Sequence, residues 1–216
     1  MFRSASEKRP ADERWQHFVK ANAGKQMVAQ GHHTDDVFVL CAGWAFRYIQ
    51  LPDGSRQILK FILPGEIFSP ALIFENIPAW SVKALTTVQA TAFKRNEIRA
   101  RCCCDDDLSS TVAKSFIEDK YHADRLLAMV AHTSAEQRIA YLLLHLMHRI
   151  AARSVIREGR YFFPLRQQHI ADAVGLTTVH VSRVLGGFRD RRILSLADGV
   201  LQIINRGELD RIGLLS

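Results

Sequence analysis

The sequence predicts an α+β protein in three consecutive parts: a β-barrel, a long helix, and a small helical domain that ends in a β-hairpin. Residues 26–93 hold short apolar or alternating segments separated by turns that contain Gly or Pro, which is typical of a small barrel or sandwich. Residues 108–131 contain no Gly or Pro and repeat apolar residues at helical spacing. Beyond residue 166, two short helical patterns flank a glycine. We place the boundaries of the three parts at 1–104, 105–133 and 134–216.

The predicted barrel strands are bounded by turn residues. VFVLC (37–41) is a short apolar run, and AFRYIQL (45–51) alternates polar and apolar residues. The Asp-Gly pair in PDGS (52–55) is a strong hairpin signal and leads into RQILKFIL (56–63). SVKALTTVQATAF (81–93) is rich in β-branched residues, which favour strands. Several short strands of this kind predict one compact β domain.

The long helix is predicted to carry an apolar face that needs a partner. One helical register brings together a set of mostly apolar residues: Ala113, Phe116, Lys120, Ala123, Leu127 and Val130. A second copy of the same helix would cover that face, and its own barrel is the alternative. We expect a homodimer through this helix, because two-fold dimers are the commonest oligomers.

The last part begins with an N-terminal helix signature and continues into two short helices. Thr133 with Glu136, or Ser134 with Gln137, would form a capping box ahead of the strongly apolar helix 138–150. We expect a loop over residues 153–160. The pattern RQQHIADAVG then predicts a helix over 166–174 that Gly175 ends, and Thr177 stands at the N-cap position of the next helix.

The helix after Thr177 has two different faces. Val181, Val184, Leu185 and Phe188 form an apolar face at helical spacing. Two short helices joined by a tight glycine turn are a helix-turn-helix, and RILSL with VLQII (192–204) predicts a hairpin that would be its wing. The outward residues are expected to contact double-stranded DNA: Gln168, Thr177, Thr178, Val179, His180, Ser182 and Arg183. A solvated helix in a protein-binding module is the alternative.

The charge distribution favours a DNA partner. The chain carries a net charge of +7. Residues 149–216 hold eleven Arg and no Lys against six acidic residues, and so carry +5 of it. An arginine fork suits phosphates and guanine edges, and Arg183 would pair with guanine. No apolar stretch approaches a membrane span, the first residues lack an apolar leader core, and the four Cys form no disulfide pattern. We therefore expect a cytoplasmic protein with no membrane partner.

Residues 166–204 resemble the DNA-binding domain of the Crp/Fnr family of bacterial transcription regulators, and the order of barrel, long helix and winged helix-turn-helix resembles that family over nearly the whole chain. The resemblance implies a cyclic-nucleotide-binding-like jelly-roll barrel and RNA polymerase as a partner. It implies that Arg183 reads a base and that Ser182 assists it. A Glu that many members carry would fall on Val179, so the half-site should differ from the usual one at that base pair.

The resemblance also implies an effector pocket in the barrel, with Gly65, Glu66, Trp80 and Ser81 as candidates. Members that bind cyclic nucleotides use a Gly-Glu pair and a later Arg-Ser pair. Gly65, Glu66 and Ser81 match, but Trp80 stands where the phosphate-binding Arg should be. The phosphate charge would then be unmatched. We expect weak or absent cyclic AMP binding and favour a plain barrel turn as the role of Gly65 and Glu66, so the effector is unknown.

The cysteines and histidines predict no metal cofactor. The first 40 residues lack the cysteines that hold an iron–sulfur cluster in the oxygen-sensing branch, and Cys102, Cys103 and Cys104 are too close together to wrap one. A redox switch at this run is a hypothesis, with a plain linker as its alternative. His32 and His33 would point to opposite faces of a strand. We expect no enzyme activity. A ligand-independent or architectural DNA binder and, less favoured, a cupin-type enzyme are the alternative functions.

Overall fold

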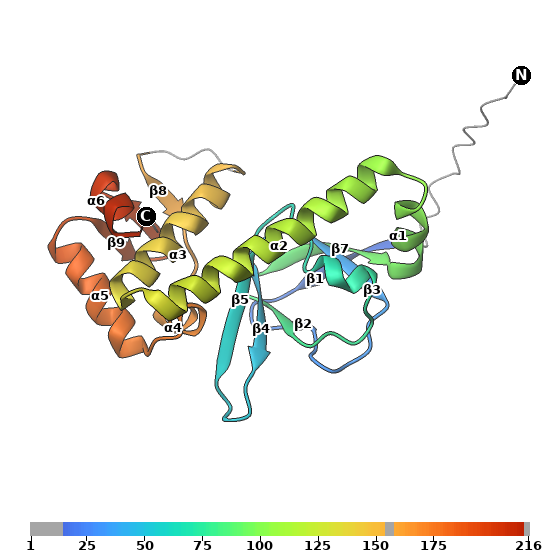
Figure 1. Cartoon of the computed structure of the whole chain (residues 1–216), viewed down its shortest axis with the longest axis horizontal. Coiled ribbons are helices and arrows are strands. Elements are labelled where there is room, and N and C mark those ends of the chain that lie inside the picture. Colours follow the sequence, from blue (N-terminus) through green and yellow to red (C-terminus); the bar gives the residue numbers. More distant parts are fainter. Residues whose placement is uncertain (1–14, 154–157, 214–216) are drawn as a thin grey trace, which may run out of the picture.

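The computed structural model describes residues 15–153 and 158–213. It comprises a β domain, a long helix and a C-terminal domain (Figure 1). The elements in chain order are β1 (Gln16–Ala21), β2 (Gln26–Val28), β3 (Asp36–Ala42), β4 (Ala45–Gln50), β5 (Arg56–Ile62), the 3-10 helix η1 (Pro70–Ile73), β6 (Ser81–Ala84), β7 (Val88–Lys94), α1 (Arg95–Cys102), α2 (Asp106–His132), α3 (Ala135–Ala151), β8 (Arg160–Phe162), α4 (Gln167–Val174), α5 (Thr178–Asp190), β9 (Leu194–Ala197), β10 (Val200–Ile203) and α6 (Arg206–Gly213).

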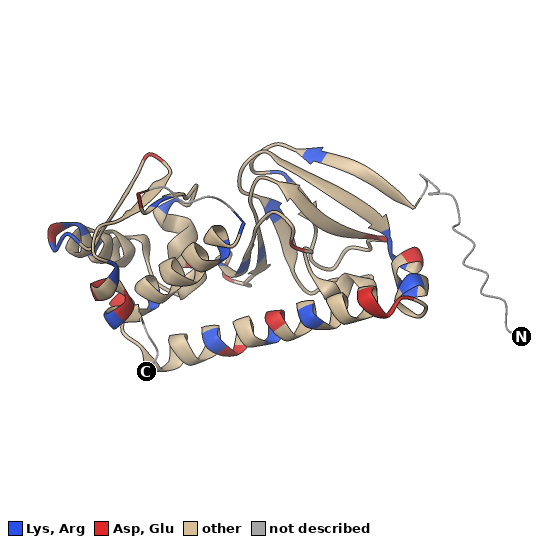
Figure 2. Cartoon of the chain, turned by 90° about the horizontal axis from the view of Figure 1, so that it is seen from above, with Lys and Arg blue, Asp and Glu red and all other residues tan. Residues whose placement is uncertain are grey.

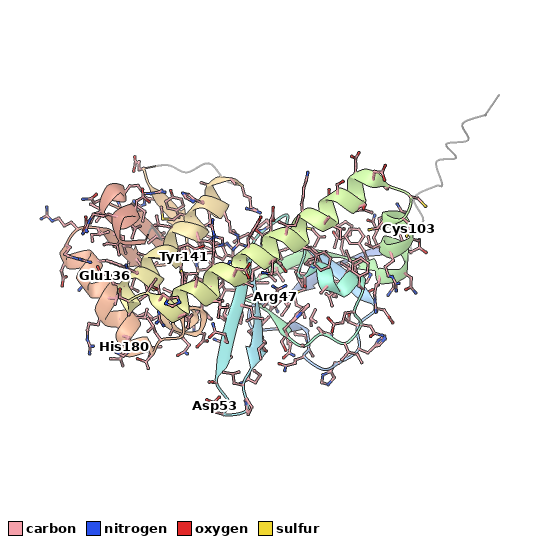
Figure 3. The ribbon with its side chains drawn as sticks, in the orientation of Figure 1. Arg47, Asp53, Cys103, Glu136, Tyr141 and His180 are labelled. Atoms are coloured by element: carbon pink, nitrogen blue, oxygen red, sulfur yellow. The ribbon has the colours of Figure 1, made fainter. Side chains whose placement is uncertain are left out.

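Two antiparallel sheets build the β domain, with strand orders β1-β7-β3 and β2-β6-β4-β5. Residues from both sheets, such as Leu40 and Val82, are fully buried between them. The β4–β5 hairpin turns where the Asp-Gly pair predicts it. Asp53 lies at its tip (Figure 3) and accepts a hydrogen bond from the Ser55 backbone N–H at 2.9 Å. Gly54 adopts φ +83° there. The β domain and this hairpin are confirmed.

Strands β4 and β5 are buried on both faces. Ala45 and Ile62 point into the β domain, while Phe46 and Phe61 belong to the core of the C-terminal domain. The alternation of side chains along a strand sends successive residues to opposite faces, so one hairpin contributes to two cores. The C-terminal domain therefore packs directly on the barrel.

Helix α2 runs the length of the molecule beside both domains (Figure 1). The Asp105 side chain caps its first turn by accepting from Leu108 N at 2.9 Å. Its less exposed residues recur at spacings of four and three, the spacing of one helix face: Leu108, Val112, Ser115, Asp119, His122, Leu126 and Met129. That face packs on the protein itself. Phe116, Ile117, Leu127 and Val130 remain exposed.

Helix α3 begins at the Ser134–Gln137 capping box, in which both reciprocal hydrogen bonds form. The alternative pair does not form. Thr133 donates its hydroxyl to the Met129 carbonyl instead, and Glu136 pairs with Arg191, the C-cap residue of α5. Within the described residues, no helix has both the length and the apolar character that crossing a bilayer requires.

The structure adds elements that the sequence patterns did not indicate. Strand β1 precedes the predicted β region, and its Phe18 is largely exposed. Arg160, placed in the predicted loop, begins β8, which pairs with β10 of the wing. Residues 154–157 of that loop lie outside the described residues. Helix α6 packs on α3, where a Cβ on Gly213 would lie 2.7 Å from Leu144 Cδ1.

Candidate DNA-binding surface and effector pocket

The turn between α4 and α5 is fixed by local chemistry. Gly175 ends α4 in the left-handed conformation, with φ +66°, and its N–H donates to the Ala171 carbonyl. A Cβ at this glycine would meet no atom within 4 Å, so backbone conformation rather than space requires Gly. Thr177 then caps α5 by accepting from His180 N at 3.3 Å. Both predicted roles are confirmed.

The inner face of α5 anchors the helix to the domain core. Val181, Leu185 and Phe188 are buried, and Val184 packs at their edge. The same cluster holds Ile170 of α4. Because this face is closely packed, the orientation of the outer face is fixed relative to the domain.

The outer face carries the residues predicted to contact DNA. Gln168, Thr177, Val179, His180, Ser182 and Arg183 are exposed, and Thr178 is half-buried. The Val179 side chain is 65% exposed. Within the described residues, Arg183 makes no ion pair and no side-chain hydrogen bond. The structure thus brings the predicted set together on one surface, at the end of the C-terminal domain where His180 lies in Figure 3.

Three members of that set already have intramolecular partners. The Thr177 hydroxyl caps α5 and lies 3.1 Å from His180 Nδ1. Gln168 donates to Asp172 Oδ1 at 2.5 Å. These contacts orient the side chains, and they leave the His180 Nε2 edge available for a phosphate.

The predicted wing forms beside the helix-turn-helix. Strands β9 and β10 pair from Leu194 to Ile203, and Asp198 and Gly199 both adopt positive φ in the two-residue turn. A tight two-residue hairpin turn of this type requires positive φ at both central positions. The wing hairpin is therefore confirmed, with β8 as a third strand.

Polar contacts tie the helix-turn-helix to the barrel. Arg56 of β5 donates to Asp172 Oδ2 of α4 at 2.5 Å, and Gln57 donates to the Ala173 carbonyl at 3.1 Å. The ring of His169 on α4 lies 5.7 Å from that of Phe46 on β4. Burial and the nearby Arg56 charge lower the pKa of His169 to about 4. A movement of the barrel hairpin would therefore act directly on α4.

Glu66 binds helix α3. Arg149 donates to Glu66 Oε2 at 2.6 Å and Arg153 donates to Oε1 at 2.8 Å, and Leu63 N donates to Oε2 at 3.2 Å. Gly65 forms the turn before it, with φ +87°. Both carboxylate oxygens have partners, so this carboxylate serves as a contact between barrel and α3.

Trp80 and Ser81 are buried where β6 begins. Trp80 is 9% exposed and its ring lies 5.4 Å from the Arg47 guanidinium carbon. The Ser81 hydroxyl accepts from Gln30 N at 3.0 Å. The indole therefore occupies the core at the position where the resemblance would place an arginine. Gly65 and Glu66 line one cavity between the barrel and α2, and Trp80 and Ser81 are not among its lining residues.

The cysteine run forms the junction between α1 and α2. Cys102 ends α1, Cys103 is its C-cap residue, and Cys104 is exposed. Burial, with Cys103 and Asp105 beside it, raises the pKa of the Cys102 thiol. The Arg101 guanidinium stacks 3.9 Å from the Trp15 ring centroid. Figure 2 shows the acidic start of α2 next to this junction. A raised pKa disfavours the reactive thiolate.

Metal ligands do not cluster in the part of the chain that the structure describes: no group of three or more His, Cys, Asp or Glu side chains could hold an ion there. His32 and His33 lie in the loop between β2 and β3, and not on a strand as the pattern suggested. Gly31, with φ +73°, turns the chain just before them.

The sequence patterns missed a cleft between β5, α2 and α3. Its volume is about 510 Å³, and basic side chains dominate its lining, among them Lys60, Arg125, Arg149 and Arg153. His145 and Arg149 are four residues apart in the strongly apolar α3 segment. Polar residues at such spacing on an apolar helix were the signal that could have indicated it.

Both domains match known protein families. Residues 18–102 match the cyclic nucleotide-binding domain, and residues 137–212 match the Crp-like helix-turn-helix domain. The nitrogen fixation regulation protein FixK of Rhizobium meliloti is 29% identical over 177 residues, which cover 81% of this chain and 76% of FixK. The fumarate and nitrate reduction regulatory protein of Vibrio cholerae is 25% identical over 195 residues, covering 86% of this chain and 74% of that protein.

Solved structures share the whole arrangement. FixK2 from Bradyrhizobium japonicum superposes with a TM-score of 0.84 at 21% identity, covering 93% of this chain and 98% of FixK2. A CooA variant from Carboxydothermus hydrogenoformans gives a TM-score of 0.76 at 15% identity, covering 95% and 91%. These likenesses extend over the barrel, α2 and the winged helix-turn-helix. The chain belongs to the Crp/Fnr family of DNA-binding transcription regulators.

Proposed function

We propose that this regulator binds a palindromic operator as a homodimer and inserts α5 of each subunit into the major groove. The observation that carries the proposal is Arg183: it is exposed, has no intramolecular partner among the described residues, and lies on a helix whose opposite face is anchored. A recognition helix places such residues on base edges. RNA polymerase is the proposed further partner, and the cytoplasm is the proposed location.

Base reading is assigned to three neighbouring positions. Arg183 donates both arms to guanine O6 and N7, a contact that contributes about 1–3 kcal/mol of discrimination. Ser182 supports it, and the exposed Val179 side chain contacts a thymine methyl or excludes another base. The half-site therefore departs from one that a glutamate at position 179 would read.

The dimer is assigned to the exposed face of α2. Leu127 is 71% exposed, Val130 40% and Phe116 37%, and all three belong to the register predicted for the dimer. Two copies packed along this face would bury these side chains and set two α5 helices about 34 Å apart, one turn of DNA. This is the separation that a palindrome with adjacent half-sites requires.

The barrel is proposed to gate DNA binding through its contacts with α3 and α4, in response to a signal other than cyclic AMP. Glu66 is already paired with Arg149 and Arg153, and Trp80 is buried. Both features disfavour a cyclic phosphodiester, and isothermal titration with cyclic AMP tests this directly. The buried indole also favours a second candidate, a regulator that binds DNA without any ligand.

Selection of bound DNA from a random pool tests the proposal. The wild-type chain should enrich a palindrome, and Arg183→Ala should weaken binding to it about 10- to 100-fold. Arg189→Ala is the matched control, because Arg189 is exposed near the end of α5 and should keep the sequence preference. Equal enrichment by wild type and Arg183→Ala would reject the assignment. A palindrome recovered without any ligand would favour the second candidate.

Sedimentation tests the dimer separately. Leu127→Glu should convert the dimer to monomers, because the charge would be buried in the interface. Lys114→Glu is the control, since Lys114 is exposed and lies about 140° around the helix from Leu127. A Leu127→Glu protein that remains dimeric would exclude this face.

A further inference from the structure

The cleft between β5, α2 and α3 has an excess of positive charge. Four cationic side chains line it, Lys60, Arg125, Arg149 and Arg153, against two carboxylates. The cations come from three different elements and the segment after α3, so no single helix face explains their convergence. A concave site with several convergent charges of one sign is a typical ligand site.

Part of this charge is left without a partner. Glu66 forms ion pairs with Arg153 and with one edge of Arg149, and Asp119 forms an ion pair with Lys60 at 2.7 Å. The Nη1 atom of Arg149 is buried and has no hydrogen-bond partner among the residues that the structure describes. Within the described residues, Arg125 makes no ion pair. Buried donors are normally satisfied, so two guanidinium edges of this cleft are available to an acceptor that the chain does not supply.

Two imidazoles lie beside these cations, and burial together with the positive charge lowers their pKa values. The rings of His122 on α2 and His145 on α3 stack with centroids 4.9 Å apart. Burial and the Arg149 charge lower the pKa of His122 to about 4 and that of His145 to about 3. Both rings are neutral at physiological pH. His122 Nε2 lies 2.9 Å from the Leu59 carbonyl, and its buried Nδ1 has no partner in the described part of the chain. As the acceptor of that neutral tautomer, Nδ1 suits a ligand hydroxyl.

We propose that this cleft binds a small organic anion, with Arg125 and Arg149 contacting a phosphate or carboxylate head group. Guanidinium groups match both head groups through paired hydrogen bonds. The exposed ring of Tyr121 at the cleft offers an apolar surface to the rest of the molecule. A volume of about 510 Å³ admits a ligand as large as a mononucleotide.

The position of the cleft links the ligand to the DNA-binding domain. An anion on the Nη1 edge of Arg149 would share that guanidinium with Glu66 and so weaken the ion pair that joins the barrel to α3 (Figure 3 shows α3 around Tyr141). Binding would therefore shift how the barrel and the C-terminal domain meet. This last step rests on the proposed gating, whereas binding itself does not.

Isothermal titration of the full-length chain without DNA tests the binding. Phenyl phosphate, benzoate and inorganic phosphate serve as probes, so the first two distinguish the head groups and the third shows whether the organic part matters. Arg125→Gln should weaken binding about tenfold. Arg99→Gln is the control, because Arg99 is an exposed arginine on α1. Glu118→Gln, which removes an acid from the lining, should tighten binding several-fold, and a misfolded protein could not give that result.

The proposal is overturned if none of the three probes binds in the millimolar range, or if Arg125→Gln and Arg99→Gln behave alike. A second titration, of operator DNA with and without the bound probe, distinguishes anion binding at the cleft from gating of DNA binding by that anion. Binding of the anion without any change in DNA affinity would keep the site and reject the gating. Loss of DNA recognition in Arg183→Ala has no bearing on the anion titration.

Discussion

The carboxylate of Asp119 on α2 neutralises two barrel cations, and removing it should strongly destabilise the protein. Arg47 and Lys60 donate to its two oxygens at 2.8 and 2.7 Å. The three side chains are only 11–14% exposed. Breaking a buried pair by deleting one partner costs about 3–5 kcal/mol, and the residual exposure favours the lower end. We expect Asp119→Asn to lower the free energy of unfolding by about 3 kcal/mol.

Urea unfolding at fixed protein concentration measures this loss. Asp190→Asn is the control: its pair with Arg189 is solvent-exposed, so the change should stay below about 0.5 kcal/mol. The pH dependence gives a second check. Burial raises the pKa of Asp119, but the Arg47 and Lys60 charges outweigh it, and the pKa lies below its usual value. The stabilisation is thus present near pH 7 and lost as pH falls through this lowered pKa.

The gap between wild type and Asp119→Asn should therefore close in acid, below about pH 4. A loss at neutral pH no larger than that of the Asp190→Asn control would refute the reasoning. A gap that stays constant down to low pH would also refute it, because it would show that the ionised carboxylate is not what stabilises the fold.

Three further outcomes follow from local geometry. The pKa values of His122 and His145 are lowered to about 4 and about 3. The unfolded chain therefore binds these protons at a higher pH than the folded chain, and stability should fall as pH drops below about 6.5. In His122→Gln, the midpoint of urea unfolding should depend less steeply on pH. Gly186 lies inside α5 with open space where a Cβ would be, so Gly186→Ala should raise the free energy of unfolding by about 0.5–1 kcal/mol. A Cβ at Gly213 would lie 3.0 Å from the α3 backbone, so Gly213→Ala should lower the melting temperature. Thr177→Ala should cost about 1 kcal/mol through the lost cap, and an unchanged melting temperature would contradict it.

Local chemistry explains how much of the DNA-binding domain could be predicted. Gly175 and Thr177 act through their own backbone and near neighbours, so the spacing of a few residues is sufficient to place them. The packed face of α5 follows from the same helical period. The predicted surface residues then lie together because one rigid helix and its cap carry nearly all of them.

The contacts of the candidate effector residues could not be predicted in the same way. Glu66 pairs with Arg149 and Arg153, more than 80 residues later in the chain, and no local pattern encodes such a contact. The Ser81 hydroxyl accepts a hydrogen bond from the backbone N–H of Gln30, which lies in another loop. Strand β1 was missed because Phe18 faces solvent, and so its residues lack the regular alternation of a half-buried strand.

The double burial of the β4–β5 hairpin limits the kind of motion by which this protein can respond. Phe46, Tyr48, Ile58 and Phe61 belong to the core of the C-terminal domain. Exposing four such side chains would cost on the order of 6–12 kcal/mol, whereas a typical effector supplies about 1–3 kcal/mol of coupling. The winged domain therefore cannot detach from the barrel in response to a ligand. Under the proposed gating, the expected movement is a sliding of packed surfaces rather than their separation.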